Sequence, residues 1–190
     1  MQPIFAPHKP RQERKKKGKE GESEPPDHAL GRSRGGLTTK IHLLCDAVGH
    51  PLAVDLLPGN QSESTQAERL LSKVRIPTKQ GRPRNRPQYL VADKSYDVSR
   101  IRVYLRKRGI KAAIPNKAIP KGRKRRKRGP RPKCDKRLYA KRNIVERLFG
   151  WLKHCRRIVT RFEKKATHFL TMVKLACIRQ LFKAYFSDTT

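Results

Sequence analysis

Glu146 lies within a run of cationic and phenolic residues that would share one side of a helix. Tyr139, Arg142 and Lys153 flank it, at successive intervals of three, four and seven residues. At about 100° per residue, the four side chains fall within a sector roughly 60° wide. The neighbouring sector is apolar and would face a core; its members are Leu138, Val145, Leu148, Phe149 and Leu152. The pattern predicts a lone carboxylate among cations at the edge of a buried helix face. The alternative is an ordinary amphipathic helix with a solvated charged face.

Asp93 is a second carboxylate in a setting suited to chemistry. It ends a short apolar run, which is typical of a central strand covered on both faces, and α/β folds place reactive groups at that end of a strand. Two carboxylates from separate elements beside a basic surface suit Mg²⁺, which completes its shell with water and phosphate. We expect Asp93 and Glu146 to be catalytic metal ligands in phosphoryl transfer. Arg142 and Lys153 would hold phosphate, and Tyr139 would donate a hydrogen bond to it. A two-metal nuclease or strand transferase is favoured over a passive binder.

A sheet and several helices must bring these residues together. The expected elements are strands over 38–46 and 51–57, a helix over 66–73, a strand over 88–93, a helix over 97–107, a strand over 110–114, and helices over 136–155 and 166–185. The first two strands would form an antiparallel hairpin. The strand–helix–strand unit implies a parallel pair with a right-handed crossover. The predicted class is α/β.

The charge of the chain points to a polyanionic partner. Its 190 residues include 48 Lys and Arg against 15 Asp and Glu, a formal net charge of +33. A compact chain of such charge repels itself, and nucleic acid would relieve the repulsion. Aromatic residues make up only 6%, which favours tracking of the phosphate backbone over stacking of single-stranded bases. Residues 115–133 are expected to form a basic loop on phosphates, through Arg123, Lys124, Arg125 and Arg126. The alternatives are a solvated loop or a nuclear-localisation-like run.

Three further features of the sequence concern disorder, metal binding by cysteines, and membrane association. Residues 1–36 are basic and lack a helical or strand period, so we predict a disordered or poorly packed lead-in. The four cysteines form no CxxC pair, and His154, Cys155, His168 and Cys177 match no common zinc spacing, so reduced thiols are expected. The sequence has no apolar run long enough for a signal peptide or a membrane span, so neither membrane nor secretion is expected.

Two motifs resemble those of DDE transposases from bacterial insertion sequences. The spacing Tyr-x2-Arg-x3-Glu-x6-Lys around Glu146 is similar to the signature at that family's last acid. Residues 93–97, Asp-Lys-Ser-Tyr-Asp, resemble its second-acid motif Asp-Lys-Gly-Tyr-Asp, with Ser95 in place of glycine. The stretches 31–42 and 58–61 resemble the insertion-sequence-five family in its split-frame branch. The likeness extends over residues 31–182.

The resemblance implies a ribonuclease-H-like fold, a mixed sheet flanked by helices, over residues 37–186. It implies Mg²⁺-dependent cutting and joining at transposon ends, with Mn²⁺ as a substitute metal. Asp93 would be the second metal ligand and Glu146 the third. Lys94, Arg142 and Lys153 would contact DNA together with Tyr139. The implied partners are double-stranded DNA of the ends and of the target, and a second copy in a homodimer. The implied location is the bacterial cytoplasm, at the nucleoid.

The family's first acid has no evident counterpart in the sequence. In the family, this Asp lies on the first strand, ahead of the Gly-rich basic segment. The only Asp in residues 1–30 is Asp27, and no apolar strand carries it. Asp46 and Asp55 belong to the predicted hairpin and are expected to be turn or edge residues. The first strand and the first acid are therefore both expected to be missing, leaving a partial catalytic domain.

The chain alone is therefore expected to bind DNA but to be incomplete as an enzyme. In the split-frame branch, two overlapping frames are joined by ribosomal frameshifting. An upstream-frame product carrying the first Asp would then complete the carboxylate set. The alternative is a non-catalytic basic nucleic-acid-binding protein or a regulator of transposition.

Overall fold

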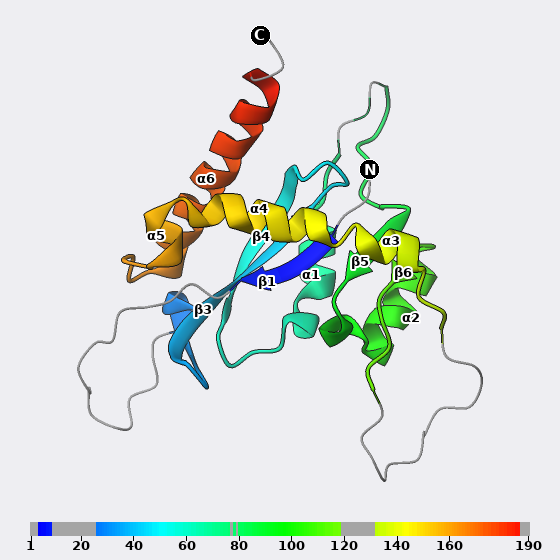
Figure 1. The fold of residues 1–190 in the computed structure, drawn as a ribbon, viewed down its shortest axis with the longest axis horizontal. Helices are drawn as coiled ribbons and strands as arrows, with labels where there is room; N and C mark the ends of the chain where they lie inside the picture. Colours follow the sequence, from blue (N-terminus) through cyan, green and yellow to red (C-terminus); the bar gives the residue numbers. More distant parts are fainter. Residues whose placement is uncertain (1–3, 9–25, 77, 79, 119–131, 187–190) are drawn as a thin grey trace.

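A mixed sheet with helices on both faces forms the body of the protein (Figure 1). The computed structural model describes residues 4–8, 26–76, 78, 80–118 and 132–186. Its strands are β1 (Ile4–His8), β2 (Gly31–Ser33), β3 (Gly36–Cys45), β4 (Pro51–Pro58), β5 (Tyr89–Ala92) and β6 (Lys111–Ala113). Its α-helices are α1 (Ala67–Ser72), α2 (Ser99–Lys107), α3 (Lys136–Ala140), α4 (Asn143–Lys153), α5 (Arg156–Val159) and α6 (Ala166–Phe186). Three short 3₁₀ turns are η1 (Pro26–His28), η2 (Glu63–Thr65) and η3 (Lys94–Tyr96).

The sheet has antiparallel and parallel halves that meet at β1. On one side β1 pairs antiparallel with β3, which also pairs antiparallel with β2 and β4. On the other side β1 runs parallel to β5, and β5 runs parallel to β6. The predicted hairpin of β3 and β4 and the predicted parallel pair around α2 are both confirmed. The fold is therefore mixed α/β, as expected.

The expectation that the first strand is missing is wrong. Residues 4–8 form β1 in the centre of the sheet, where Ile4 is opposite both Cys45 of β3 and Val91 of β5. The lead-in expected to be disordered over residues 1–36 also contains η1 and β2, although residues 9–25 lie outside the described part. The reason is physical, since strand pairing from both sides supplies order that five residues without alternation do not reveal by themselves.

Strand alternation divides the core into two layers, because successive side chains point to opposite faces. Ile41, Leu43 and Cys45 of β3 and Val91 of β5 face α4 and α6. Leu44 of β3, with Leu90 and Ala92 of β5, faces α1 and α2 on the opposite side. Figure 1 shows α4 lying across β1, with α3 beside β5 and β6. The same alternation decides on which face each polar side chain lies.

The single helix predicted over 136–155 is divided into α3 and α4. At the junction, the N–H of Arg142 donates to the carbonyl of Tyr139 at 2.9 Å, and that of Ile144 to the carbonyl of Lys141 at 3.0 Å. These bonds span three residues rather than four, so the backbone tightens between the two helices. The N-terminal end of α3 is capped by Asp135, whose carboxylate accepts two backbone N–H groups.

Arg161 ties the connection between α5 and α6 to the start of the sheet. It is 6% exposed. Its guanidinium donates to the carbonyls of His28 at 2.7 Å, Glu163 at 2.8 Å and Lys164 at 2.8 Å, and to the hydroxyl of Thr39. The buried charge is therefore surrounded by acceptors from β3, η1 and its own loop.

Candidate active site

Asp93 directly follows β5, at the end that neighbours β1. Val91 belongs to the core layer beneath α4, and alternation places Asp93 on the same face two residues later. The residue is half-buried. In the part of the chain that the structure describes, its carboxylate makes no hydrogen bond or ion pair. An acid of this kind keeps its oxygens free for a ligand.

Glu146 lies in the first turn of α4, beside the two residues predicted to accompany it. Its Oε1 accepts a hydrogen bond from Nη2 of Arg142 at 2.6 Å. The Arg142 guanidinium lies over the ring of Tyr139, 5.8 Å from its centroid. Lys153 is exposed and follows Glu146 by seven residues, which returns it to the same side of the helix. The predicted grouping is therefore present, although Tyr139 comes from α3 rather than α4.

The two candidate acids lie on one face of the sheet. Val145, next to Glu146, packs in the same core layer as Val91, two residues before Asp93. Strand β1 connects the two places, because it pairs with β5 and packs against α4. Its sequence, Ile-Phe-Ala-Pro-His, contains no acid. The structure thus places one predicted acid directly after β5 and the other on α4, two elements that both contact β1, a strand without a carboxylate.

Asp93 and Glu146 have the oxygen chemistry that Mg²⁺ takes, but they do not complete a metal site. Among the described residues, no group of three or more His, Cys, Asp and Glu side chains is arranged to hold a metal ion. Half of the Glu146 side chain is exposed and its carboxylate is paired with Arg142. His154, Cys155, His168 and Cys177 are among the described residues that this finding covers.

The other acids considered from the sequence have structural roles. Oδ1 of Asp46 accepts the backbone N–H groups of Val48, Gly49 and His50 at 2.8–2.9 Å, which closes the hairpin turn. Asp55 is ion-paired with Lys73 at 2.6 Å and with Arg69 at 3.4 Å, through the same carboxylate oxygen. Asp27 is largely exposed in η1. These positions agree with the expected turn and edge roles of the hairpin acids.

A buried polar pair supports the turn that follows Asp93. Tyr96 ends η3, and its hydroxyl lies 2.9 Å from Nε2 of His42 on β3. Both side chains are fully buried. Burial lowers the pKa of His42 to about 4 and, together with Glu63 and Asp93, raises that of Tyr96 well above its usual value. Both groups are therefore neutral at pH 7. The sequence gives no sign of this pair, since its members are 54 residues apart.

Asp97, the last residue of the second-acid motif, binds the backbone at the start of the basic loop. Its carboxylate accepts from Nε of Arg102 at 2.6 Å and from the backbone N–H of Lys117 at 2.7 Å. Burial would raise the pKa of Asp97, but these two bonds hold it below its usual value. Asn116 closes the loop by donating to the carbonyl of Pro132 at 2.9 Å. The two ends of the basic segment are therefore fixed next to β5 and β6.

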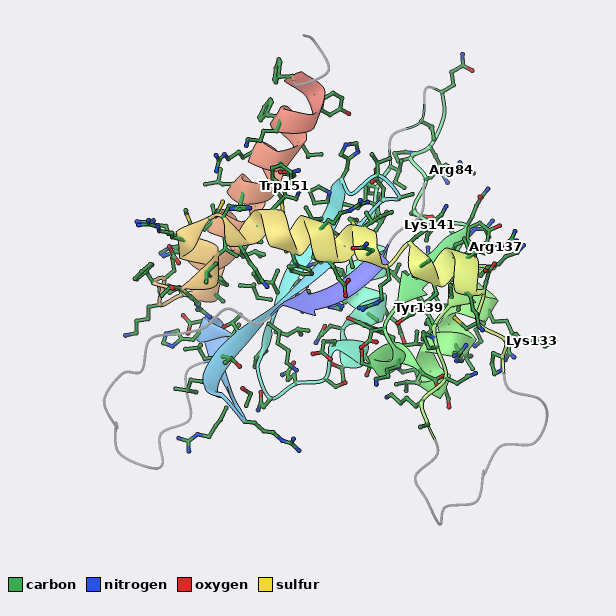
Figure 2. All side chains as sticks on the ribbon, viewed as in Figure 1. Arg84, Lys133, Arg137, Tyr139, Lys141 and Trp151 are labelled. Carbon is green, nitrogen blue, oxygen red and sulfur yellow. The ribbon has the colours of Figure 1, made fainter. Side chains whose placement is uncertain are left out.

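Cations surround this end of the molecule. Figure 2 shows Lys133, Arg137 and Lys141 on and around α3, with Arg84 from a preceding loop on the same side of the view. Lys94, next to Asp93, is exposed. The predicted phosphate contacts Arg123, Lys124, Arg125 and Arg126 lie outside the described residues. The surface near the two acids is therefore one on which a polyanion would be attracted.

The chain belongs to the DDE transposase family. The sequence model of the family described as "Transposase DDE domain" matches residues 6–181. The chain is 34% identical over 141 residues to a putative transposase for insertion sequence element IS6501 of Brucella ovis, covering 74% of this chain and 95% of that protein. It is 35% identical over 147 residues to a putative transposase for insertion sequence element IS402 of Burkholderia cepacia, covering 77% of this chain and 63% of that protein. The resemblance drawn from the motifs is confirmed. Within the described residues, no helix is both long and apolar enough to cross a membrane.

Proposed function

We propose that this chain binds double-stranded transposon ends and target DNA as a ribonuclease-H-like catalytic domain of an insertion-sequence transposase. Strand cleavage and transfer, with Mg²⁺ or Mn²⁺, would require a third carboxylate, supplied when the chain is joined to an upstream-frame product. The observation that supports this proposal is that β5, which Asp93 follows, and α4, which carries Glu146, both contact the acid-free β1. The described ligand set is incomplete, so we assign to the chain by itself only the binding of DNA.

The residues around Glu146 support a role in holding phosphate. The Arg142 guanidinium is oriented by Tyr139 and Glu146, and its remaining N–H groups have the fork geometry that suits a phosphate. Lys153 and Lys94 would add charge on the same side. Glu146 opposes phosphate electrostatically, so a surface that only binds DNA gains nothing from it. An acid kept inside a cationic row favours the enzyme over the passive binder.

DNA binding is tested by the salt dependence of affinity for a duplex. Each phosphate that a variant no longer neutralises should reduce the slope of log K against log salt by about 1. Arg142→Ala and Lys153→Ala should each do so. Arg32→Ala is the matched control, because Arg32 is an exposed cation of β2, at the opposite end of the strand order from β5 and β6. Equal slopes in all three variants would refute the proposed DNA surface.

Catalysis is tested in two proteins that differ only in the upstream segment. The chain alone with Mg²⁺ should not cleave transposon-end DNA. The product fused to an upstream frame that supplies the first Asp should transfer strands, and Glu146→Gln or Asp93→Asn should abolish transfer while duplex binding survives. Robust cleavage by the chain alone that Asp93→Ala removes would overturn the claim of incompleteness. A fused product that is indifferent to Glu146→Gln would favour the non-catalytic DNA binder or regulator.

The same proposal predicts that the active form is a homodimer, because two transposon ends have to be joined and each would need its own copy of the chain.

A further inference from the structure

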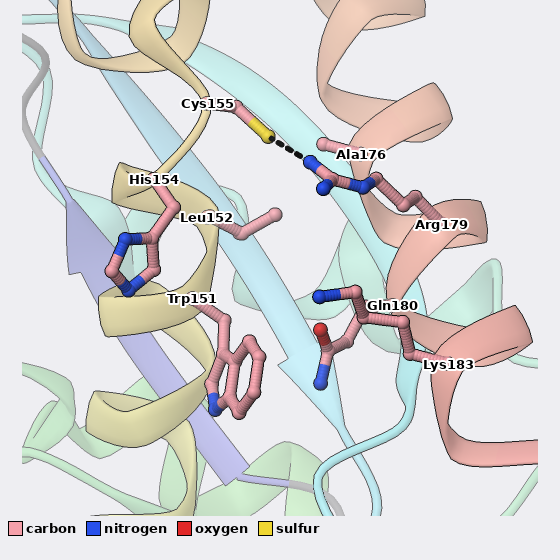
Figure 3. A pocket seen from close by; sticks show the side chains of 8 residues that line it. All are labelled: Trp151, Leu152, His154, Cys155, Ala176, Arg179, Gln180 and Lys183. Carbon is pink, nitrogen blue, oxygen red and sulfur yellow. Dashed lines mark hydrogen bonds between the residues drawn. The ribbon is translucent and has the colours of Figure 1, made fainter. Parts of the chain in front are cut away.

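A pocket between the C-terminal half of α4 and the middle of α6 lies apart from the two acids (Figure 3). Its volume is about 320 Å³. The residues that line it are Trp151, Leu152, His154, Cys155, Ala176, Arg179, Gln180 and Lys183. No carboxylate is among them. The pocket therefore combines an aromatic wall with cations and with the amide of a glutamine.

Trp151 is the aromatic wall of this pocket and is unusually open for its size. Its side chain is 49% exposed, although tryptophan buries most of its surface in a typical domain. Figure 3 shows its indole, on α4, facing the side chains of Gln180 and Lys183 on α6. The Lys183 ammonium lies over the ring, 5.5 Å from its centroid, and His154 meets the ring edge-on at 6.3 Å. The half-exposed indole is thus flanked by an ammonium over its face and by an imidazole.

The cations and the indole of the pocket suit a ligand that has a negatively charged group and, next to it, a planar ring. Arg179 contacts Sγ of Cys155 at 4.0 Å, a weak interaction that leaves most of its N–H groups available. Lys183 follows Arg179 by one helical turn, so the two charges line the same side of α6. A phosphate would be attracted by both, while a ring stacked on Trp151 would gain dispersion and cation–π energy.

We infer that this pocket binds an unpaired nucleotide of DNA, with the base stacked on Trp151 and the adjoining phosphate held by Arg179 and Lys183. The inference goes beyond the proposed function because it assigns a site for single-stranded DNA, distinct from the duplex-binding surface and from Asp93 and Glu146. Every base has a face that can stack, so the site would accept any of the four. The few aromatic residues of the chain favour tracking of the phosphate backbone over base stacking, but stacking of a single base needs only one half-exposed indole beside cations.

Trp151 is the only tryptophan of the chain, so its fluorescence reports directly on this pocket. The full chain is titrated with an oligothymidylate of about 12 nucleotides and, separately, with a duplex of equal length. The single strand should quench the fluorescence in a saturable way, and the duplex should quench it much less at the same occupancy. Arg179→Ala and Lys183→Ala should each weaken single-strand affinity, and Trp151→Ala, followed with a labelled oligonucleotide, should weaken it roughly fivefold or more.

Lys174→Ala is the matched control, because Lys174 is an exposed cation of α6 that does not line the pocket. It should bind the single strand almost as the unaltered chain does, and circular dichroism should show every variant folded. Equal quenching by duplex and single strand, or equal weakening in Lys174→Ala and Arg179→Ala, would overturn the inference. So would shielding of Trp151 from acrylamide that increases with protein concentration, because copies of the chain would then cover this face.

The experiments can contradict the single-strand pocket without contradicting the proposed transposase function, and the reverse. A chain that binds duplex with the predicted salt slopes but shows no single-strand quenching lacks the pocket function and keeps the proposed one. A fused product that never transfers strands, yet quenches on single strands in a manner dependent on Arg179, shows the reverse.

Discussion

Acidification should destabilise the protein through His42, and the effect can be isolated. The folded protein holds this histidine neutral, with a pKa of about 4, whereas the ordinary value is 6.5. Burial is the main cause, and Glu63 and Asp55 oppose it while Lys73 adds to it. Between these pH values His42 is protonated in the unfolded chain but neutral in the folded protein. The free energy of unfolding therefore decreases as the pH decreases.

The magnitude follows from the two pKa values. The slope between them is about 1.4 kcal/mol per pH unit, and lowering the pH from about 7 to about 5 costs about 2 kcal/mol through His42 alone. That is a large part of the 5–15 kcal/mol by which domains are typically stable. The stability is fully present above about pH 6.5 and is lost progressively down to about pH 4.

Urea unfolding of the unaltered chain and of His42→Gln, at several pH values, tests this reasoning. Glutamine cannot titrate, so the stability difference between the two proteins should shrink by about 2 kcal/mol from pH 7 to pH 5. The other histidines and the growing net charge are common to both proteins and cancel. Tyr96→Phe is the control, because it removes the hydrogen bond to His42 but keeps the titrating group, and its pH dependence should match that of the unaltered chain. Parallel curves for the unaltered chain and His42→Gln would refute the argument.

Three further outcomes are expected. Arg161→Met should lower the free energy of unfolding by about 3–5 kcal/mol, because buried acceptors lose a charged donor, while the exposed Arg157→Met should change it by less than about 1 kcal/mol; urea titration compares them. The pKa of Asp97 is lowered in the folded protein, so its ionised carboxylate stabilises the fold at neutral pH. Asp97→Asn should remove this stability, and the unaltered chain and the variant should converge in stability as the pH falls through the carboxyl range. Burial, with a smaller contribution from Cys155, raises the pKa of Cys177 to about 12, so mass spectrometry should find this thiol alkylated only when denaturant is present.

Local patterns in the sequence were sufficient for most of the elements. The hairpin of β3 and β4 has its own turn residues, and β5 and β6 are short, mostly apolar runs on either side of α2. The row of Tyr139, Arg142 and Glu146 was also visible, because contacts three and four residues apart are set by helix geometry alone.

What the sequence did not reveal depends on contacts between distant residues. β1 is five residues long and includes Pro7, which argues against a central strand, yet only Ile4 and Phe5 pair with β5, so the proline lies beyond that ladder. The pair of His42 and Tyr96, and the pocket around Trp151, each join two elements that are separate in the chain. No periodicity within one element can show such an arrangement.

The central place of β1 has a consequence for how the protein folds. Ile4 must find Cys45 on one side and Val91 on the other, so the middle of the sheet closes two long loops at once. The chain loses the conformational entropy of those loops before the paired strands contribute favourable free energy, and this slows folding. The hairpin of β3 and β4 can form early, because its strands are neighbours. Until β1 joins it, β3 presents an open strand edge, so refolding at high protein concentration should compete with aggregation through that edge.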